Sequence, residues 1–452
     1  MSKYLVIAVI LVLSAAPVAG IGPHEVVVLV NAGSSDSVEV AKKYCRMRDI
    51  PANNVVRLNL PEGMGTKKSM ISREAFTRHI WAPARRKIKK KGIGDTAVAW
   101  IYSVDFPTKI GTQIQMSLHG LTFTRNRVPS DVEIKEGRYE SPLFAGLKRA
   151  PGKAYRSQTF DVYREWLGDS MPLPVMSLGY TGERGSTKAA VLDCLDRGRE
   201  SDYTSPSGTV YFVKQDDIRS KCRHWQFGPV ADELRGLGIK ARITHSFPSG
   251  AEDVIGLMIG KANVDPGNIT AYRPGCMAEH LTSAAGIFSG AGQTKLTEWI
   301  DAGATASAGT VTEPYSIWRK FPAARFFVHY AAGCTMIESF YQSIFSPLQI
   351  MLVGDPLASP WSTRGRIKIE GLPEDEAAGL LEIKSAASDE DDSHYGRYLY
   401  LLDGRPIGSG REFSFDTRKV KDGFYKLRIV AYRTGLIRNQ VYVIESLRIK
   451  NR

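Results

Sequence analysis

Short apolar runs alternate with segments of helical periodicity along much of this chain, and that alternation constrains its fold more than any other feature. The run 26–30 is apolar at every position, and Val38, Ala41, Tyr44 and Cys45 then recur at helical spacing. Strands that are buried on both faces of a parallel sheet have such continuous apolar runs. Repetition of the strand–helix unit predicts a doubly wound α/β domain with a mainly parallel sheet.

The expected elements follow one another from residue 26 to residue 353. Helices are expected at 72–91, 186–197 and 229–235, and each precedes a strand, at 96–103, 208–213 and 239–244. Further strands are expected at 54–60, 253–260, 268–272, 302–311 and 348–353, with a helix at 331–343. The segment 104–172 lacks this regularity, and we interpret it as an insertion over one edge of the sheet.

The first 20 residues have the pattern of a secretory signal peptide. Lys3 precedes an apolar run over 5–15, and the small residues Val18, Ala19 and Gly20 suit cleavage near Gly20. The alternative is an N-terminal anchor helix. No second apolar span follows, so we expect an exported protein, periplasmic or extracellular, with no transmembrane span in the mature chain.

The composition changes near residue 365. Residues 21–362 are expected to form the α/β domain, and 365–452 a second one with short strands at 366–369, 380–384, 397–402, 412–416, 423–432 and 440–449. Asp403-Gly404 and Asp422-Gly423 are turn signals between such strands. This spacing predicts an immunoglobulin-like β-sandwich.

The formal net charge is +13, but the basic residues are spread along the chain. Their one dense run, 85–91, ends an expected helix, where positive charge complements the helix dipole. The alternative is contact with an anionic surface or polymer. Because export is expected, the ligand should be extracellular or in the envelope, and no nucleic acid is expected.

Polar side chains follow several expected strands, and ligands of open α/β sheets bind at the carboxyl ends of strands. The ligand-binding candidates of this kind are Asn31, Ser34, Asp105, Ser283 and Asp355. Glu313 follows the strand expected at 302–311 and is a catalytic candidate, with a turn role as the alternative. The loop 31–36 lacks the glycine spacing of a nucleotide-binding motif, so no nucleotide is predicted, and the sequence leaves other cofactors open.

Cys276 is the candidate nucleophile. If 277–285 is helical, His280 shares a face with Cys276 and is its candidate base; His119 is the other candidate. The competing interpretation is a buried thiol. Glu279 and His280 suit general acid–base chemistry, or metal ligation with Asp105 or Asp355, or hydrogen bonds that only hold the loop.

The cysteines give no metal motif. There are five of them, none in a Cys-x-x-Cys pair, so no zinc site of that type is predicted. The odd number leaves at least one cysteine outside an internal disulfide. Their pairing stays open at this stage.

Five motifs resemble an uncharacterised family of exported bacterial proteins over about residues 25–361. They are Asp36-Ser37 with Ala41 and Tyr44, the Arg-Asp-Ile-Pro-Ala-Asn-Asn segment at 48–54, Glu-His-Leu-Thr-Ser at 279–283, Gly-Thr-Val-Thr-Glu-Pro at 309–314, and Gly-Asp-Pro at 354–356. This family has no assigned activity, so the resemblance implies none for this chain.

More remotely, the order of elements is similar to that of gingipain- and caspase-like cysteine peptidases. That resemblance implies a nucleophile near Cys276 and a Gly/Ala-rich strand near 302–309, followed by the Gly-Asp-Pro at 354–356. It also implies a His-Gly at the end of the preceding strand, where this chain has Ile259, Gly260 and Lys261; its own His119-Gly120 lies far earlier.

Two functions of different class follow. One is a hydrolase related to these peptidases, which uses Cys276 or the Glu279 and His280 pair. The other is a non-catalytic extracellular or envelope module that binds a ligand at the same edge of the sheet. Because polar groups from separate parts of the chain converge on one edge of the sheet, the sequence favours the hydrolase, with the binding module as the alternative. It leaves the substrate, metal dependence and oligomeric state open.

Overall fold

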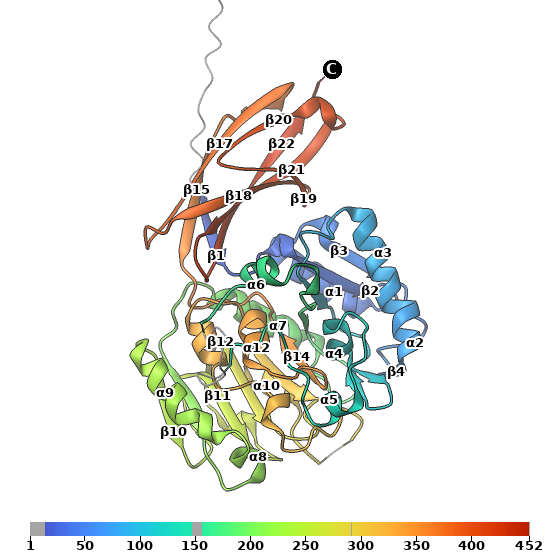
Figure 1. Ribbon diagram of the computed structural model, residues 1–452, viewed down its shortest axis with the longest axis vertical. Helices are drawn as coiled ribbons and strands as arrows, with labels where there is room; N and C mark the ends of the chain where they lie inside the picture. Colours follow the sequence, from blue (N-terminus) through green and yellow to red (C-terminus); the bar gives the residue numbers. More distant parts are fainter. Residues whose placement is uncertain (1–13, 147–155, 291, 452) are drawn as a thin grey trace, which may run out of the picture.

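The computed structural model describes residues 14–146, 156–290 and 292–451. It consists of an α/β domain and a C-terminal β domain at one end of it (Figure 1). The α/β domain is built on ten strands in the order β10-β9-β11-β12-β13-β14-β8-β5-β2-β3. In sequence they are β2 (Val26–Asn31), β3 (Val55–Leu58), β5 (Ala99–Tyr102), β8 (Val175–Ser177), β9 (Thr209–Val213), β10 (Lys240–Thr244), β11 (Val254–Gly260), β12 (Tyr272–Leu281), β13 (Ala306–Thr310) and β14 (Ile350–Gly354).

The sheet is mixed but mainly parallel, as predicted. Strands β3, β2, β5 and β8 pair in parallel, and so do β10, β9, β11, β12 and β13. Between these groups, β13 and β14 pair antiparallel, and β14 meets β8 at a single bridge between Val353 and Ser177.

Helices cover both faces of the sheet. The main ones are α1 (Ser35–Met47), α3 (Ala82–Lys91), α7 (Lys188–Ser201), α9 (Phe227–Gly236), α10 (Leu296–Ala302), α11 (Phe326–Ala331) and α12 (Met336–Ser343). In β9, Phe212 packs against Phe227 of α9 and Phe327 of α11. Its neighbours Tyr211 and Val213 belong to a different core, with Trp299 of α10. Because successive strand residues point to opposite faces, both faces are buried.

The region around β12 differs from the sequence-based expectation. The strand expected at 268–272 and the helix considered for 277–285 are both wrong, because one strand runs from Tyr272 to Leu281. Its polar residues Glu279 and His280 obscured the strand in the sequence. They are tolerated there because each has a polar partner inside the domain.

The helix expected at 72–91 is present but interrupted. It starts as α2 (Arg73–Phe76), passes through a π-helical turn at Thr77–Trp81, and continues as α3. Pro83 lies just after the turn and cannot donate a backbone hydrogen bond, which accounts for the local change of helix type.

The irregular segment 104–172 is folded into the domain where it is described. It contributes β6 (Lys109–Gly111), β7 (Met116–Ser117), α4 (Leu118–Phe123), α5 (Asp131–Lys135) and α6 (Phe160–Leu167), and with β4 (Met70–Ser72) forms a small sheet. Every residue of α4 is buried. The segment is thus partly core rather than only an insertion over an edge.

The C-terminal domain contains all six strands expected from the sequence. Its strands are β15 (Arg364–Glu370), β16 (Glu376–Ala377), β17 (Leu380–Asp389), β18 (Tyr395–Leu402), β19 (Arg405–Ser409), β20 (Glu412–Asp416), β21 (Gly423–Arg433) and β22 (Gln440–Ile449). Apart from the short β16–β22 pair they pair antiparallel. A strand from the N-terminal segment, β1 (Ser14–Ala19), lies between β22 and β15.

A buried charge network ties the end of β14 to the ends of α1 and α7. Arg48 pairs with both Asp355 and Asp202, and all three side chains are at most 5% exposed. Tyr44 donates a hydrogen bond of 3.4 Å to Asp355. Asp355 is therefore a structural residue of the domain interior, and its assignment as a ligand-binding residue is corrected.

We expect Asp355→Asn to destabilise the protein strongly, because it leaves the buried Arg48 with one carboxylate fewer. Removal of one partner of a buried pair costs about 3–5 kcal/mol. The control is Asp196→Asn, which breaks the exposed pair with Lys43 and should cost less than about 1 kcal/mol. Urea unfolding of both variants measures the difference, and equal costs would contradict the structural role.

Candidate functional site

Three of the predicted ligand-binding residues meet at the carboxyl edge of the sheet. Asn31 donates a hydrogen bond of 2.9 Å to the carbonyl of Asp105, and Ser34 donates to its carboxylate. Thr181, which follows β8 and was not predicted, binds the other carboxylate oxygen at 2.8 Å. Asp105 has a left-handed backbone, with φ of 62°. The sequence placed this group correctly, but its members hydrogen-bond mainly to one another.

Ser283 and Glu313 form a second pair at the same edge. The Ser283 hydroxyl donates to Glu313 at 3.1 Å, and the Tyr315 amide donates to the same oxygen at 2.8 Å. Tyr180, just after β8, stacks on Phe288, beyond β12, with ring centroids 3.8 Å apart. This stack places the loops after β8 and β12 side by side, so both polar groups belong to one edge.

Cys276 lies in the middle of β12 and is fully buried. Burial raises the pKa of its thiol well above the ordinary value, so the thiolate is disfavoured. His280 is four residues along the same strand, about 13 Å away at the rise per residue of a β-strand. The Cys276–His280 pair considered for a helix therefore does not form.

Both candidate histidine bases are buried and use both ring nitrogens. His280 accepts from Trp299 at 2.8 Å and donates to the carbonyl of Thr294 at 3.1 Å. His119 accepts from the Leu352 amide at 3.2 Å and donates to Ser177 at 2.8 Å. Burial lowers the pKa of each to about 3. They are structural hydrogen-bonding residues rather than bases beside a nucleophile.

Glu279 is on the opposite face of β12 from His280. It is fully buried and lies 2.5 Å from the guanidinium of Arg223, which is 1% exposed. Arg223 also donates to the carbonyls of Ile259 and Pro322. The predicted acid–base pair is thus split between two faces of the sheet, and Glu279 acts as the counterion of a buried arginine.

We expect Cys276 of the native protein to resist iodoacetamide, because its thiol is buried and its pKa is raised. Labelling should become rapid only in urea. Cys222, which is partly exposed, serves as the internal control and should react first. Peptide mapping by mass spectrometry measures both rates. Fast native labelling of Cys276 that is lost in His280→Ala would restore the cysteine mechanism.

The described residues contain no group of three or more His, Cys, Asp or Glu side chains arranged to hold a metal ion. All five cysteines are unpaired. None of the helices in the described ranges has the length and apolar character needed to cross a bilayer.

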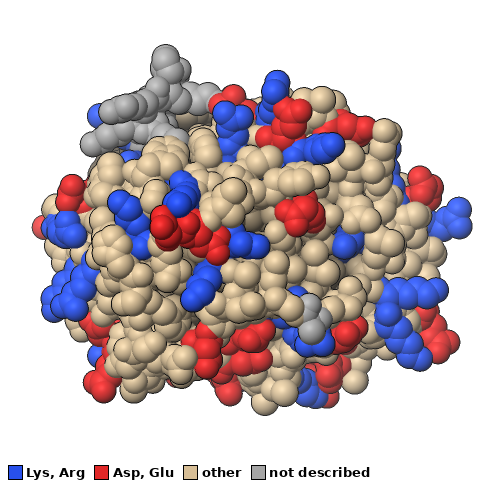
Figure 2. Space-filling model, turned by 90° about the horizontal axis from the view of Figure 1, so that it is seen from below, with Lys and Arg blue, Asp and Glu red and all other residues tan. Residues whose placement is uncertain are grey.

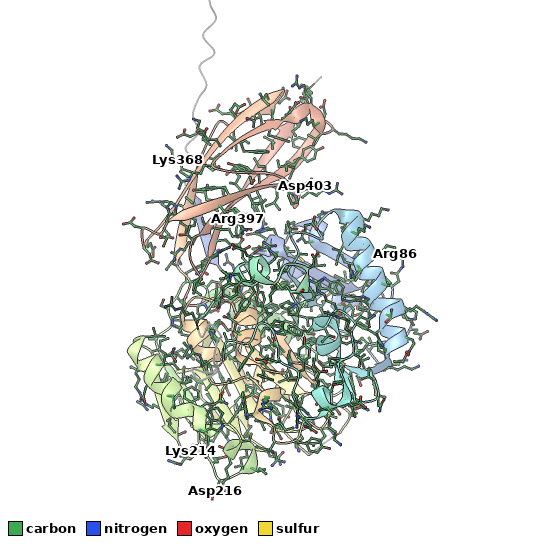
Figure 3. All side chains as sticks on the ribbon, viewed as in Figure 1. Arg86, Lys214, Asp216, Lys368, Arg397 and Asp403 are labelled. Carbon is green, nitrogen blue, oxygen red and sulfur yellow. The ribbon has the colours of Figure 1, made fainter. Side chains whose placement is uncertain are left out.

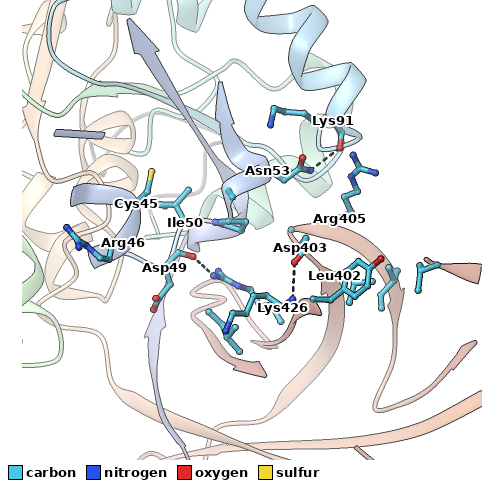
Figure 4. Close-up of a pocket in the computed structure, with 18 of the residues that line it drawn as sticks. Cys45, Arg46, Asp49, Ile50, Asn53, Lys91, Leu402, Asp403, Arg405 and Lys426 are labelled. Carbon is cyan, nitrogen blue, oxygen red and sulfur yellow. Dashed lines mark hydrogen bonds between the residues drawn. The ribbon is translucent and has the colours of Figure 1, made fainter. Parts of the chain in front are cut away.

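A large cleft lies between the two domains, and the sequence analysis did not identify it. Its volume is about 1150 Å³. The α/β domain lines it with 49–53, at the amino end of β3, and with Lys91 at the end of α3; the other wall comes from β18, β19, β21 and β22 (Figure 4). The cleft is thus at the edge opposite to the predicted one.

Most of the charged side chains that line the cleft are positive. They are Arg46, Lys91, Arg405, Lys421, Lys426 and Arg428. The acidic residues of the lining are Asp49 and Asp403, each of which also accepts a hydrogen bond. By contrast, acidic and basic side chains are interspersed on the face of the α/β domain farthest from the C-terminal domain (Figure 2).

The cations of the cleft have few opposite charges near them. Burial lowers the pKa of Lys91, and the nearby Arg405 and Lys87 lower it further. None of the six takes part in an ion pair with a carboxylate within the described ranges. Two like charges that approach across a cleft repel each other, and an anion between them removes that repulsion.

Arg428 is the most constrained of these cations. It is 4% exposed, lies over the ring of Tyr442 at 4.6 Å, and donates from Nη2 to the carbonyl of Asp49. Its Nη1 is buried and finds no hydrogen-bond acceptor among the residues that the structure describes. Burial lowers the pKa of Arg428. A buried guanidinium nitrogen without an acceptor is costly unless a ligand supplies one.

The sequence carried two weak signals of this cleft. The basic run 85–91 ends at Lys91, and Asp403-Gly404 forms the turn on the facing wall. The sequence analysis assigned the basic run to a helix end and Asp403-Gly404 to a turn between strands, without relating one to the other. Their proximity depends on how the domains pack: a side chain at Gly404 would lie 2.7 Å from Pro51.

Comparisons with known proteins give little further information. No family model matches the chain, and no curated protein matches it. One solved structure, of fibronectin(III)-like modules of Clostridium thermocellum CbhA, is 23% identical over 24% of this chain and 54% of that chain, with a TM-score of 0.17. The endo-β-1,4-mannanase from Thermotoga petrophila is 10% identical over 96% and 98% of the two chains, also with a TM-score of 0.17. Similarity at this level carries no argument about fold or function.

Proposed function

We propose that this is an exported binding protein that holds an anionic ligand in the cleft between its two domains. The observation that carries the proposal is the buried Nη1 of Arg428, which has no acceptor within the described part of the chain. Five further cations line the same cleft. Of the two functions expected from the sequence, this is the non-catalytic one. The ligand position differs from the expectation, because the cleft is opposite to the carboxyl edge.

The geometry gives the hydrolase less support. A thiol nucleophile needs an accessible thiolate and a base within hydrogen-bonding distance. Cys276 is buried, and His119 and His280 are held by other partners. The polar groups at the carboxyl edge, around Asp105 and Glu313, hydrogen-bond mainly within themselves.

The proposal includes the two fold relationships expected from the sequence, to gingipain- and caspase-like proteins and to immunoglobulin-like sandwiches. A mainly parallel sheet covered on both faces, with Gly354-Asp355-Pro356 at the end of β14, supports a distant relationship to gingipain- and caspase-like proteins without their mechanism. An immunoglobulin-like sandwich is supported by the pairing of β15, β17 and β20 in one group and of β19, β18, β21 and β22 in another.

The distribution of charge indicates the type of ligand. Arg405, Lys421 and Lys426 come from the C-terminal domain, whereas Arg46 and Lys91 come from the α/β domain. Charges on two walls suit an elongated ligand with several sulfate, phosphate or carboxylate groups better than a single small anion. Arginine binds each of these planar or tetrahedral groups through paired donors.

We expect the protein to bind at least one of three anionic oligomers: an octasaccharide of heparin, a short polyphosphate or an oligogalacturonate. These probes carry sulfate, phosphate and carboxylate, and a neutral oligosaccharide of similar length is the uncharged control. Titration calorimetry at low ionic strength measures the affinity, which should fall steeply as salt screens the exposed cations.

Two triple variants, one in the cleft and one outside it, test whether the anion binds in the cleft. Combined Lys91→Ala, Arg405→Ala and Lys421→Ala should weaken binding at least about tenfold, which corresponds to about 1.4 kcal/mol. Combined Lys67→Ala, Lys214→Ala and Lys261→Ala removes the same charge from exposed sites outside the cleft; Lys214 is at the far end of the molecule from Asp403 (Figure 3). Equal losses in the two triple variants, or no binding of any probe, would overturn the proposal.

A further inference from the structure

A buried carboxylate lies where the chain enters the α/β domain. Glu338 in the first turn of α12 is fully buried. One of its oxygens accepts from the Phe160 amide at 2.8 Å, and the other accepts from the amide and hydroxyl of Thr335 at 3.0 and 2.9 Å. The backbone N–H of Ile21 also faces this carboxylate.

No positive side chain faces Glu338 among the described contacts. Its polar neighbours are the neutral donors of Thr335, Phe160 and Ile21, together with the thiol of Cys334 and the phenol of Tyr163. Burial raises the pKa of Glu338 to about 7, and the hydrogen bonds oppose only part of that rise. A buried carboxylate without a countercharge is destabilising when it ionises.

The segment Gly20–Gly22 passes directly over this carboxylate. A Cβ atom at Gly20 would lie 2.0 Å from a Glu338 oxygen, so only glycine fits there. Gln440 of the C-terminal domain donates to the Gly20 carbonyl at 2.6 Å and to the Glu25 carboxylate, also at 2.6 Å. The Ile21 side chain is 2% exposed and belongs to the main core. Contacts with both domains therefore hold the backbone at Ile21 next to Glu338.

We infer that Glu338 is the binding site for the α-ammonium group that cleavage after Gly20 creates at Ile21. The inference rests on the proposed export. A leader peptidase hydrolyses the Gly20–Ile21 peptide bond with one water molecule. The C–N bond breaks, Gly20 leaves as a carboxylate, and the freed amine of Ile21 takes up a proton. That ammonium supplies the countercharge that Glu338 otherwise lacks.

Cleavage has a second consequence in the C-terminal domain. It removes β1, which pairs with β15 on one side and β22 on the other. The remaining strands then divide into the groups β15-β17-β20 and β19-β18-β21-β22. Gln440 loses the Gly20 carbonyl and keeps Glu25. Before cleavage, pairing of β1 holds the start of the chain in place. After cleavage, the Ile21–Glu338 ion pair takes over this role.

The first test is the mass of the exported protein, which should correspond to a chain that starts at Ile21. The second is the acylation rate of its α-amine at pH 8. We expect this rate to be at least about tenfold lower in the native protein than in urea, because the ion pair holds the amine in a buried site. A different N-terminus, or an α-amine that reacts equally fast in both states, would overturn the inference.

The pH dependence of stability gives an independent test on chains that start at Ser14 or at Ile21. In the longer chain the folded pKa of Glu338 is about 7, above the ordinary 4.5, so its melting temperature should fall as the pH rises between these values. In the Ile21 chain the ammonium keeps Glu338 ionised, and the fall in this window should be absent. Stability is instead lost at higher pH, where the amine deprotonates.

Glu338→Gln provides the matched control because it keeps the size of the side chain and removes its charge. In the longer chain it should abolish the fall between pH 4.5 and 7. In the Ile21 chain it should lower the melting temperature by several degrees at pH 7 and restore fast acylation of the amine. The same effect of Glu338→Gln in both chains would show a purely structural role and overturn the inference, while anion binding in the cleft would remain testable separately.

Discussion

Burial of the main sheet on both faces is the constraint on which the rest of the α/β domain depends. A polar side chain in one of its strands cannot reach water, so it must find a partner inside the protein. His280 pairs with Trp299 and the Thr294 carbonyl, and Glu279 pairs with Arg223 on the other face. The same requirement explains why groups that suggest catalysis in the sequence serve to complete the interior.

At the boundary between the domains, buried charged groups need partners for the same reason, but not all of them find one. It is crossed by specific polar contacts, including those of His24 with Tyr432 at 2.8 Å and of Arg397 with Asp161 at 2.8 Å. These contacts hold two basic walls close to each other around a cleft. Arg428 shows the consequence most clearly, because the packing buries its guanidinium while one of its nitrogens has no acceptor among the described residues. Glu338 is the acidic counterpart, a buried carboxylate whose described polar neighbours carry no positive charge.

Much of the fold could be predicted from local patterns. Runs such as 26–30, and the turn signals of the C-terminal domain, identified strands because hydrophobic periodicity reflects which face is buried. The prediction failed at β12, where polar residues with buried partners interrupt the apolar run. It failed again at Cys276 and His280, whose separation depends on whether the segment is a strand or a helix. Partners such as Arg223 and Trp299 are distant in sequence, so no local pattern reveals them.

The sequence by itself determined the α/β architecture, the six main strands of the C-terminal domain and the polar group around Asp105. Each of these follows from short-range periodicity or from the position of a residue at the end of a strand. Only the tertiary structure decided which charged groups are neutralised. Asp355 is neutralised because it pairs with Arg48 in the folded protein. Lys91 and Arg405 line the cleft together because the two domains pack against each other. Electrostatic energy depends on distance and burial in three dimensions, and neither is recorded in the order of residues along the chain.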